Sequence, residues 1–289
     1  MISRVKSGIA GVALAPQRAG NPITVRRVVV GIVLAAVGFA CVTSPWTFNL
    51  LVLVIALFCL YELNELCEVK GQPLEYPVAV FGVFAYALFA SLGTLHKWEG
   101  VLVAGIVLAA LAIGMYGDEP GYVARTANTL LAVLYIGKLL TYFIFIRQIP
   151  SVGVAWTIYA IVLIALSDIF AMCIGTLVGR HRLTRISPKK TIEGSVGSLV
   201  AVTAIAAAAT MIAQLHLQVW QGAAIGVLTN VAAQAGDLVE SALKRDAGVK
   251  DAGSVIQGHG GMLDRFDSYL FGGTAFFASL HLIGILPIQ

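Results

Sequence analysis

The chain has 289 residues, of which 58% are hydrophobic and 12% are charged. Soluble domains are about 45–50% apolar and about 25% charged, and a globule of this size has too little interior to hide the excess apolar surface. Nineteen basic and 15 acidic residues give a formal net charge of +4. The composition excludes a disordered chain, a disulfide scaffold and a nucleic-acid-binding protein. It predicts an all-α, polytopic integral membrane bundle in a lipid bilayer.

Nine apolar segments have roughly the length that a helix needs to cross a bilayer, about 17–25 residues. Each is expected to be helical, because a backbone exposed to lipid must satisfy its own hydrogen bonds. The predicted transmembrane helices cover residues 28–45, 47–64, 77–95, 99–116, 127–147, 153–179, 196–215, 219–241 and 269–287.

The basic residues orient this arrangement. Sixteen of the 19 lysines and arginines lie in the N-terminal segment or in loops after even-numbered spans, whereas Lys97 and Arg147 lie on the opposite side and Lys138 lies inside a span. This asymmetry predicts a cytoplasmic N-terminus, and nine crossings then place the C-terminus outside. Residues 1–27 lack the order of a signal peptide and are expected to be retained.

Several reactive side chains are expected to have structural roles. Glu62 and Lys138, near or inside spans, are typical of paired or snorkelling groups, and the sequence leaves open whether they meet. The four cysteines form no CxxC pair and no Cys/His metal spacing, so they are predicted to act as small apolar residues: Cys41, Cys59, Cys67 and Cys173.

Polar residues gather in two segments on the predicted cytoplasmic side, 167–194 and 236–268. In the second segment, Asp237 lies where its helix is still apolar, and an ionisable group there is costly unless it is paired or functional. At helical spacing Asp237, Ser241 and Lys244 share one face. The alternative is an ordinary interfacial helix end, in which basic residues suit the C-terminal dipole.

The glycine-rich stretch 258–261 is followed at once by Asp264 and Asp267. Hard divalent ions such as Mg²⁺ bind carboxylate oxygens together with substrate phosphates, and Lys and Arg neutralise the remaining phosphate charge. The combination predicts a metal–phosphate site rather than an ion pathway, because a carrier would place its charges at mid-membrane. His259 is either a general base or a hydrogen-bonding loop residue.

The first polar segment offers similar chemistry. Asp168 lies within the sixth span, and Gly175 and Gly179 form a small-xxx-small pattern typical of close helix packing. The run from Ser187 to Thr191 combines hydroxyls with two lysines and suits phosphate oxygens. The basic residues just before it have an alternative role, contact with anionic lipid headgroups.

The second segment resembles the signature of phosphatidate cytidylyltransferases, also called CDP-diacylglycerol synthases. The matching residues are Ser241-Ala-Leu-Lys244-Arg245, Lys250-Asp251 and Gly258-His259-Gly260-Gly261-Met262-Leu263-Asp264-Arg265-Phe266-Asp267. The first segment is similar to the same family in Ser187-Pro-Lys-Lys-Thr-x-Glu-Gly194, preceded by Asp168-x6-Gly175-x3-Gly179. The chain departs from the family at Gln257, commonly Pro, and at Met172, usually Tyr. The resemblance covers residues 130–289, whereas the first four spans agree only in hydropathy.

The resemblance implies condensation of CTP with phosphatidic acid to give CDP-diacylglycerol and pyrophosphate, with Mg²⁺ and a second cation such as K⁺. Asp237 and Asp264 match the metal-binding carboxylates, and Asp267 is a third metal candidate. The expected catalytic residues are Asp237, Asp264, Lys244, Arg245, Lys250 and His259. The expected substrate-binding residues are Ser187, Lys189, Lys190, Thr191, Ser241, Gly258, Gly260, Gly261, Arg265 and Asp168.

We expect a basic segment (1–27), five N-terminal spans (28–147) and a catalytic domain of four spans (148–289), in the bacterial inner membrane with the active site cytoplasmic. A homodimer is compatible with the family. The alternatives are a CTP-dependent lipid kinase, a cytidylyltransferase with another lipid acceptor, a transporter and a catalytically silent scaffold.

Overall fold

A computed structural model describes residues 36–116, 121–209, 215, 217–249 and 261–286. Residues 37–289 form one compact unit, and the contacts below lie within it. The described residues form helices and no β-strand, apart from an isolated bridge between Arg182 and Thr191. The predicted all-α bundle is confirmed.

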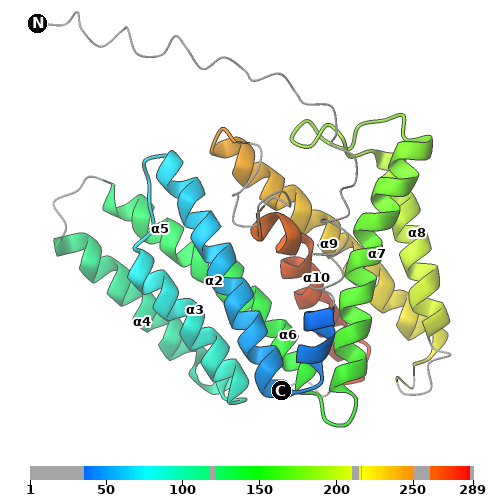
Figure 1. Ribbon diagram of the computed structural model, residues 1–289, viewed down its shortest axis with the longest axis horizontal. Coiled ribbons are helices and arrows are strands. Elements are labelled where there is room, and N and C mark those ends of the chain that lie inside the picture. Colours follow the sequence, from blue (N-terminus) through cyan, green and yellow to red (C-terminus); the bar gives the residue numbers. More distant parts are fainter. Residues whose placement is uncertain (1–35, 117–120, 210–214, 216, 250–260, 287–289) are drawn as a thin grey trace, which may run out of the picture. The chain divides into compact units, whose positions relative to one another are not determined.

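The helices follow one another along the chain, and an extended loop connects α7 to α8 (Figure 1). Their bounds are α2 (Pro45–Val69), α3 (Tyr76–Ser91), α4 (Leu95–Tyr116), α5 (Tyr122–Ala132), the π-helical turn η1 (Val133–Lys138), α6 (Leu139–Arg147), α7 (Gly153–Val178), α8 (Ile192–Ala208), α9 (Val219–Asp246) and α10 (Leu263–Leu282). Helices α5, η1 and α6 form one continuous helix, Tyr122–Arg147.

The predicted spans from 47–64 onward each fall on one of these helices. The first predicted span, 28–45, lies largely outside the described residues. Within its described part, residues 36–42 are helical. Within the described ranges, four helices are long and apolar enough to cross a membrane: Pro45–Val69, Leu95–Met115, Tyr122–Arg147 and Gly153–Val178. Helices α3 and α8 are apolar but shorter, and α9 and α10 carry the polar residues of the second segment. The chain is a multi-pass membrane protein, and the count of nine spans stays a prediction.

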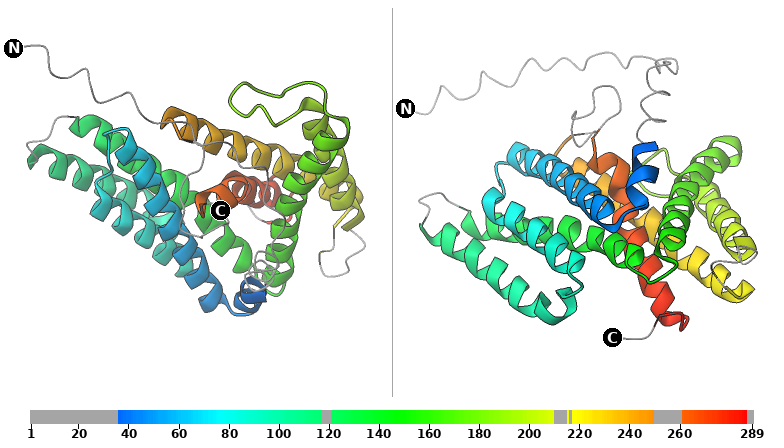
Figure 2. Two further views of the ribbon diagram at one scale, coloured as in Figure 1. Left: turned by 45° about the horizontal axis from the view of Figure 1, so that its top comes forward. Right: turned by 60° about the horizontal axis from the view of Figure 1, so that its bottom comes forward.

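Helix α10 packs along α9 and also contacts α2, α6 and α7 (Figures 1 and 2). Small residues permit the close approach, because a Cβ built on Gly236 of α9 would lie 2.4 Å from the carbonyl oxygen of Asp267 in α10. Likewise, a Cβ on Gly194 of α8 would lie 2.5 Å from the carbonyl oxygen of Ala171 in α7. The predicted division at 147/148 falls in the turn between α6 and α7, and α10 packs against helices from both sides of it.

Candidate active site

The end of α9 meets the start of α10 at a lysine held between two carboxylates. Lys244 Nζ lies 2.5 Å from Glu240 Oε2 and 2.5 Å from Asp264 Oδ1. Burial alone would lower the pKa of Lys244, but the two carboxylates raise it. Burial also opposes ionisation of Asp264, yet hydrogen bonds with Glu240, with Lys244 and with the Gly261 N–H lower its pKa. The arrangement keeps opposite charges together at this junction.

A second ion pair joins the loop before α8 to helix α9. The ammonium of Lys190 contacts the carboxylate of Asp237 on α9. The Ser241 hydroxyl donates to Asp237 across one helical turn, at 3.5 Å. The predicted shared face of α9 is therefore observed for Asp237 and Ser241, whereas Lys244 turns to Glu240 and Asp264.

Two further carboxylates meet at Ser268 of α10. The Ser268 hydroxyl donates to Asp168 Oδ1 of α7 at 3.0 Å, and the Ser268 N–H donates to Asp267 Oδ1 at 2.6 Å. Asp267 is buried and lies within electrostatic range of both Asp237 and Asp168. Helices α7, α9 and α10 thus bring three carboxylates to the same end of the bundle.

The segment between α7 and α8 is organised by Glu193. Its Oε1 lies 2.6 Å from His181 Nδ1, and its Oε2 accepts from the N–H groups of Arg180 and His181 at 3.0 and 3.2 Å. The His181 hydrogen bond is the largest cause that lowers the pKa of Glu193 to about 2. The Leu183 N–H donates to the Lys190 carbonyl at 2.8 Å, which folds the segment back and directs it toward α9.

The other predicted site residues divide into those near the ion pairs and those away from them. The Thr191 hydroxyl caps α8 by accepting from the Gly194 N–H at 3.1 Å. Ser187 is half-buried, and Lys189 and Arg265 are exposed.

The exposed Arg245 donates to the carbonyl of Val249, at 3.2 Å, rather than to a carboxylate of the cluster. Four predicted residues lie outside the described residues: Lys250, Gly258, His259 and Gly260.

A buried polar network continues from Asp237 down α9. Asn230 donates to the hydroxyls of Ser167 and Ser198, both at 2.9 Å, and Gln234 donates to Asn230 at 2.5 Å. The Ser195 hydroxyl on α8 bonds to Gln234. These residues were not predicted, although Asn230, Gln234 and Asp237 recur at the i, i+4 and i+7 spacing of one helix face. The network fixes α7, α8 and α9 beneath the charged cluster.

Sequence reasoning also missed Glu240, and it expected Glu62 to be a paired or snorkelling group without identifying its partner. Glu240 is four residues before Lys244, a spacing that predicts an ion pair. Glu62 on α2 accepts from the N–H groups of Met262 and Leu263 at 2.8 and 2.7 Å. An acidic residue in an apolar helix is a signal of function, but its partner is 200 residues away and invisible in sequence.

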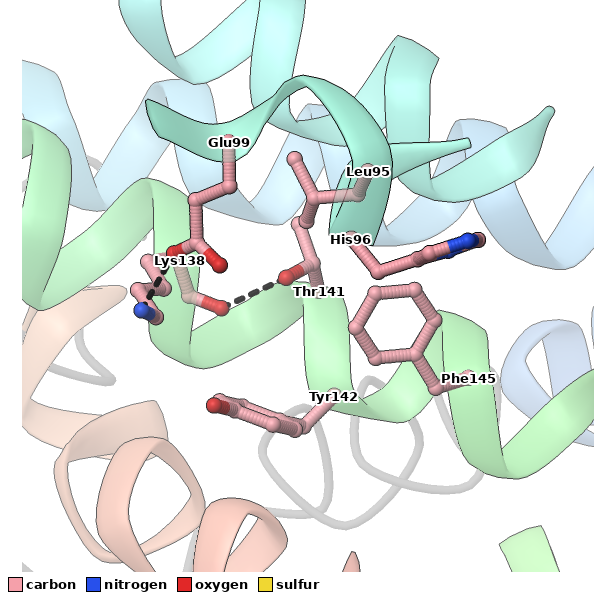
Figure 3. Close-up of a pocket in the computed structure, with 7 residues that line it drawn as sticks. All are labelled: Leu95, His96, Glu99, Lys138, Thr141, Tyr142 and Phe145. Atoms are coloured by element: carbon pink, nitrogen blue, oxygen red, sulfur yellow. Dashed lines mark hydrogen bonds and ion pairs between the residues drawn. The ribbon is translucent and has the colours of Figure 1, made fainter. Parts of the chain in front are cut away.

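Lys138 does not meet Glu62. It pairs with Glu99 of α4 at a small pocket that Leu95, His96, Thr141, Tyr142 and Phe145 also line (Figure 3). Lys138 belongs to the π-helical turn, and the pocket shares no residue with the carboxylate cluster. The pair is therefore separate from the candidate active site.

The donor chemistry of the cluster suits a hard divalent cation, which prefers carboxylate oxygens. In the described part of the chain, however, no three His, Cys, Asp or Glu side chains converge closely enough to hold a metal ion. Asp237 and Asp264 each contact a lysine instead. Asp237 and Asp264 are thus each paired with an ammonium group, whereas Asp267 accepts from the Ser268 N–H.

Comparison with known proteins covers most of the chain. The model of the cytidylyltransferase family matches residues 24–283. A Bacillus subtilis (strain 168) protein named phosphatidate cytidylyltransferase is 33% identical over 257 residues, which are 85% of this chain and 93% of the relative. Proteins of the same name from Staphylococcus aureus (strain COL) and Staphylococcus haemolyticus (strain JCSC1435) are 38% and 34% identical. They cover 82% and 84% of this chain and 88% and 90% of their own lengths. The predicted resemblance is confirmed, and it extends through the first spans.

Proposed function

The chain belongs to the cytidylyltransferase family, and we propose that it transfers the cytidylyl group of CTP to phosphatidic acid, giving CDP-diacylglycerol and pyrophosphate. It is a nucleotidyltransferase of phospholipid biosynthesis, and both substrates must reach it at the membrane. The observation that carries the proposal is that two ion pairs, Lys190–Asp237 and Lys244–Asp264, connect the loop before α8, helix α9 and the start of α10.

The reaction requires two polyanions to approach. A phosphate oxygen of phosphatidate attacks the α-phosphorus of CTP, a new P–O bond forms, and the bond from the α-phosphorus to the bridging oxygen breaks so that pyrophosphate leaves. Phosphatidate is already a nucleophile at neutral pH, so no covalent enzyme intermediate is needed. Fixed cations that offset the phosphate charge stabilise the transition state, and Lys190 and Lys244 are placed to do so.

We propose that the carboxylates of Asp237, Asp264 and Asp267 supply oxygen ligands to Mg²⁺ together with the substrate phosphates, and that a second cation such as K⁺ binds nearby. When bound, such an ion would neutralise phosphate charge and stabilise the leaving pyrophosphate. Lys190 and Lys244, which pair with Asp237 and Asp264 in the structure, can then donate to phosphate oxygens instead. Arg245, Lys250 and Arg265 complete the proposed basic lining, and the role of His259 stays open.

The positive-inside asymmetry supports a cytoplasmic active site in a bacterial inner membrane, where CTP is available. There the water-soluble nucleotide arrives from one side while the lipid arrives laterally from the bilayer. We also propose a homodimer, whose interface the sequence does not mark.

The test is product formation by the purified full chain in detergent with CTP, phosphatidic acid and Mg²⁺. We expect CDP-diacylglycerol from the wild type, and loss of product without Mg²⁺ or in Asp264→Asn. A well-folded wild type that yields CDP and a phosphorylated alcohol would indicate a lipid kinase. Activity only with another acceptor lipid would change the substrate, and a fully active Asp264→Asn would remove Asp264 from the metal site.

A further inference from the structure

The start of α10 is capped by a carboxylate from a distant helix. Helix α10 begins at Leu263, and its N-cap residue, Met262, makes no side-chain capping bond. Glu62 of α2 supplies the acceptors instead, with Oε1 receiving the Met262 N–H at 2.8 Å and Oε2 the Leu263 N–H at 2.7 Å. The first N–H groups of a helix have no partner within it, and a carboxylate there is also favoured by the helix dipole.

Glu62 is fully buried, so the Met262 and Leu263 N–H groups take the place of the water that an exposed carboxylate would bind. An ionised carboxylate that accepts two backbone N–H groups makes charge-assisted hydrogen bonds, which are about twice as strong as neutral ones. Helices α2 and α10 otherwise share a small contact. The Glu62 bonds are therefore a specific polar contact between α2 and the first turn of α10.

That turn carries Asp264. The Gly261 N–H donates to Asp264 Oδ2 at 3.0 Å, while Lys244 holds Oδ1 at 2.5 Å. A Cβ built on Gly261 would lie 2.6 Å from Glu62 Oε2 and 3.0 Å from Asp264 Oδ2. Glu62 and Asp264 thus enclose the same glycine, and a displacement of one carboxylate would move the backbone that orients the other.

We propose that Glu62 is a positioning residue for the transfer reaction: it anchors the first turn of α10 so that Asp264 faces the end of α9. The proposal rests on the proposed function, and it assigns to the N-terminal helices a part in the active site. Glu62 contacts only backbone N–H groups in the described residues, so its effect on chemistry passes through Asp264.

The test compares Glu62→Gln with Glu65→Gln in the full chain. Both variants remove one carboxylate charge from α2. Glu65, however, accepts a hydrogen bond from Tyr61 on its own helix instead of capping α10. Residues that orient metal ligands typically contribute about 10–100-fold in metal affinity or activity. We expect Glu62→Gln to raise the Mg²⁺ concentration for half-maximal activity by about 10–100-fold, with Glu65→Gln unchanged.

A second readout uses no activity. Hydrogen exchange in Mg²⁺-free buffer should speed up in the peptide that contains Met262 and Leu263 in Glu62→Gln and stay at the wild-type rate in Glu65→Gln. Gly261→Ala, which crowds Glu62 without altering its charge, should produce the same Mg²⁺ shift. The double variant should be non-additive, because both changes act on one contact. Gly261→Ala carries the test if Glu62→Gln does not fold.

Unchanged Mg²⁺ dependence in Glu62→Gln, with Asp264→Asn inactive, would overturn the proposal. The proposal would also be overturned if Glu62→Gln lost the same fraction of activity at every Mg²⁺ concentration and this loss only paralleled a lower Tm. That result would mean that Glu62 caps α10 for stability alone. A wild type that makes no CDP-diacylglycerol would instead refute the proposed function. The hydrogen-exchange result would still report on the Glu62 cap.

Discussion

Lys244 Nζ lies 2.5 Å from Asp264 Oδ1, which ties the last turns of α9 to the first turn of α10. The same ammonium lies 2.5 Å from Glu240 Oε2, whose side chain is 1% exposed. One lysine therefore forms an ion pair with a buried carboxylate and contacts a candidate metal ligand. Its removal should affect stability and activity by separable routes.

We expect Lys244→Met to lower the free energy of unfolding by about 1–3 kcal/mol, because it leaves the buried Glu240 without its ion-pair partner. Adding Glu240→Leu should restore much of the stability, since replacing both members of a buried pair with apolar residues is often neutral. Activity should stay low in the double variant, because Asp264 still lacks its cation. Thermal unfolding in detergent and product formation measure the two effects, and an active double variant would contradict the assigned role.

Lys190→Gln should reduce kcat by about 100-fold, the typical cost of losing one donor that stabilises transition-state charge. The matched control is Lys70→Gln, which removes a lysine from the exposed Lys70–Asp246 pair. That variant should retain wild-type kinetics. The measurement is the rate of pyrophosphate release at saturating CTP, and equal rates for the two variants would argue against a role of Lys190 in transfer.

The Glu193–His181 contact predicts a pH-dependent loop. The pKa of Glu193 is held at about 2, below the ordinary value of about 4.3. Its stabilising contribution is therefore complete above the unfolded value and disappears as the pH falls toward 2. At pH 8, Glu193→Gln should accelerate tryptic cleavage after Arg180, Arg182 and Arg185, because the Arg180 and His181 N–H groups lose their charged acceptor. Gel analysis of the time course measures this, and unchanged cleavage would mean that other contacts hold the loop.

Gly236→Ala should separate α9 from α10, because its Cβ would lie 2.4 Å from the carbonyl oxygen of Asp267. Overpacking of this kind costs about 1–3 kcal/mol. Activity should fall as well, since the displacement moves Asp237 relative to Asp267. Gly105→Ala in α4 is the control, because nothing lies within 4 Å of its Cβ. Its Tm should be unchanged or raised, given the higher helix propensity of Ala, and similar Tm losses in both variants would contradict the packing argument.

The sequence by itself determined the helices and the location of the charged segments. Long apolar runs must be helical in lipid, so each predicted span from 47–64 onward overlaps a helix between α2 and α10. Helical spacing also placed Asp237 and Ser241 on one face, and the signature placed Asp264 and Asp267 together after the glycine-rich stretch. These relationships are local, and the periodicity of a helix is enough to reveal them.

Only the tertiary structure decided which charges meet. Lys190 pairs with Asp237, and Lys138 pairs with Glu99 rather than with Glu62. Glu62 caps α10 from 200 residues away. Such partners are set by which helix faces pack together, and helix packing depends on small side chains and shape rather than on spacing along the chain. Few charges can be buried unpaired in such a bundle, so these long-range pairings bring polar residues that are distant in sequence into one site.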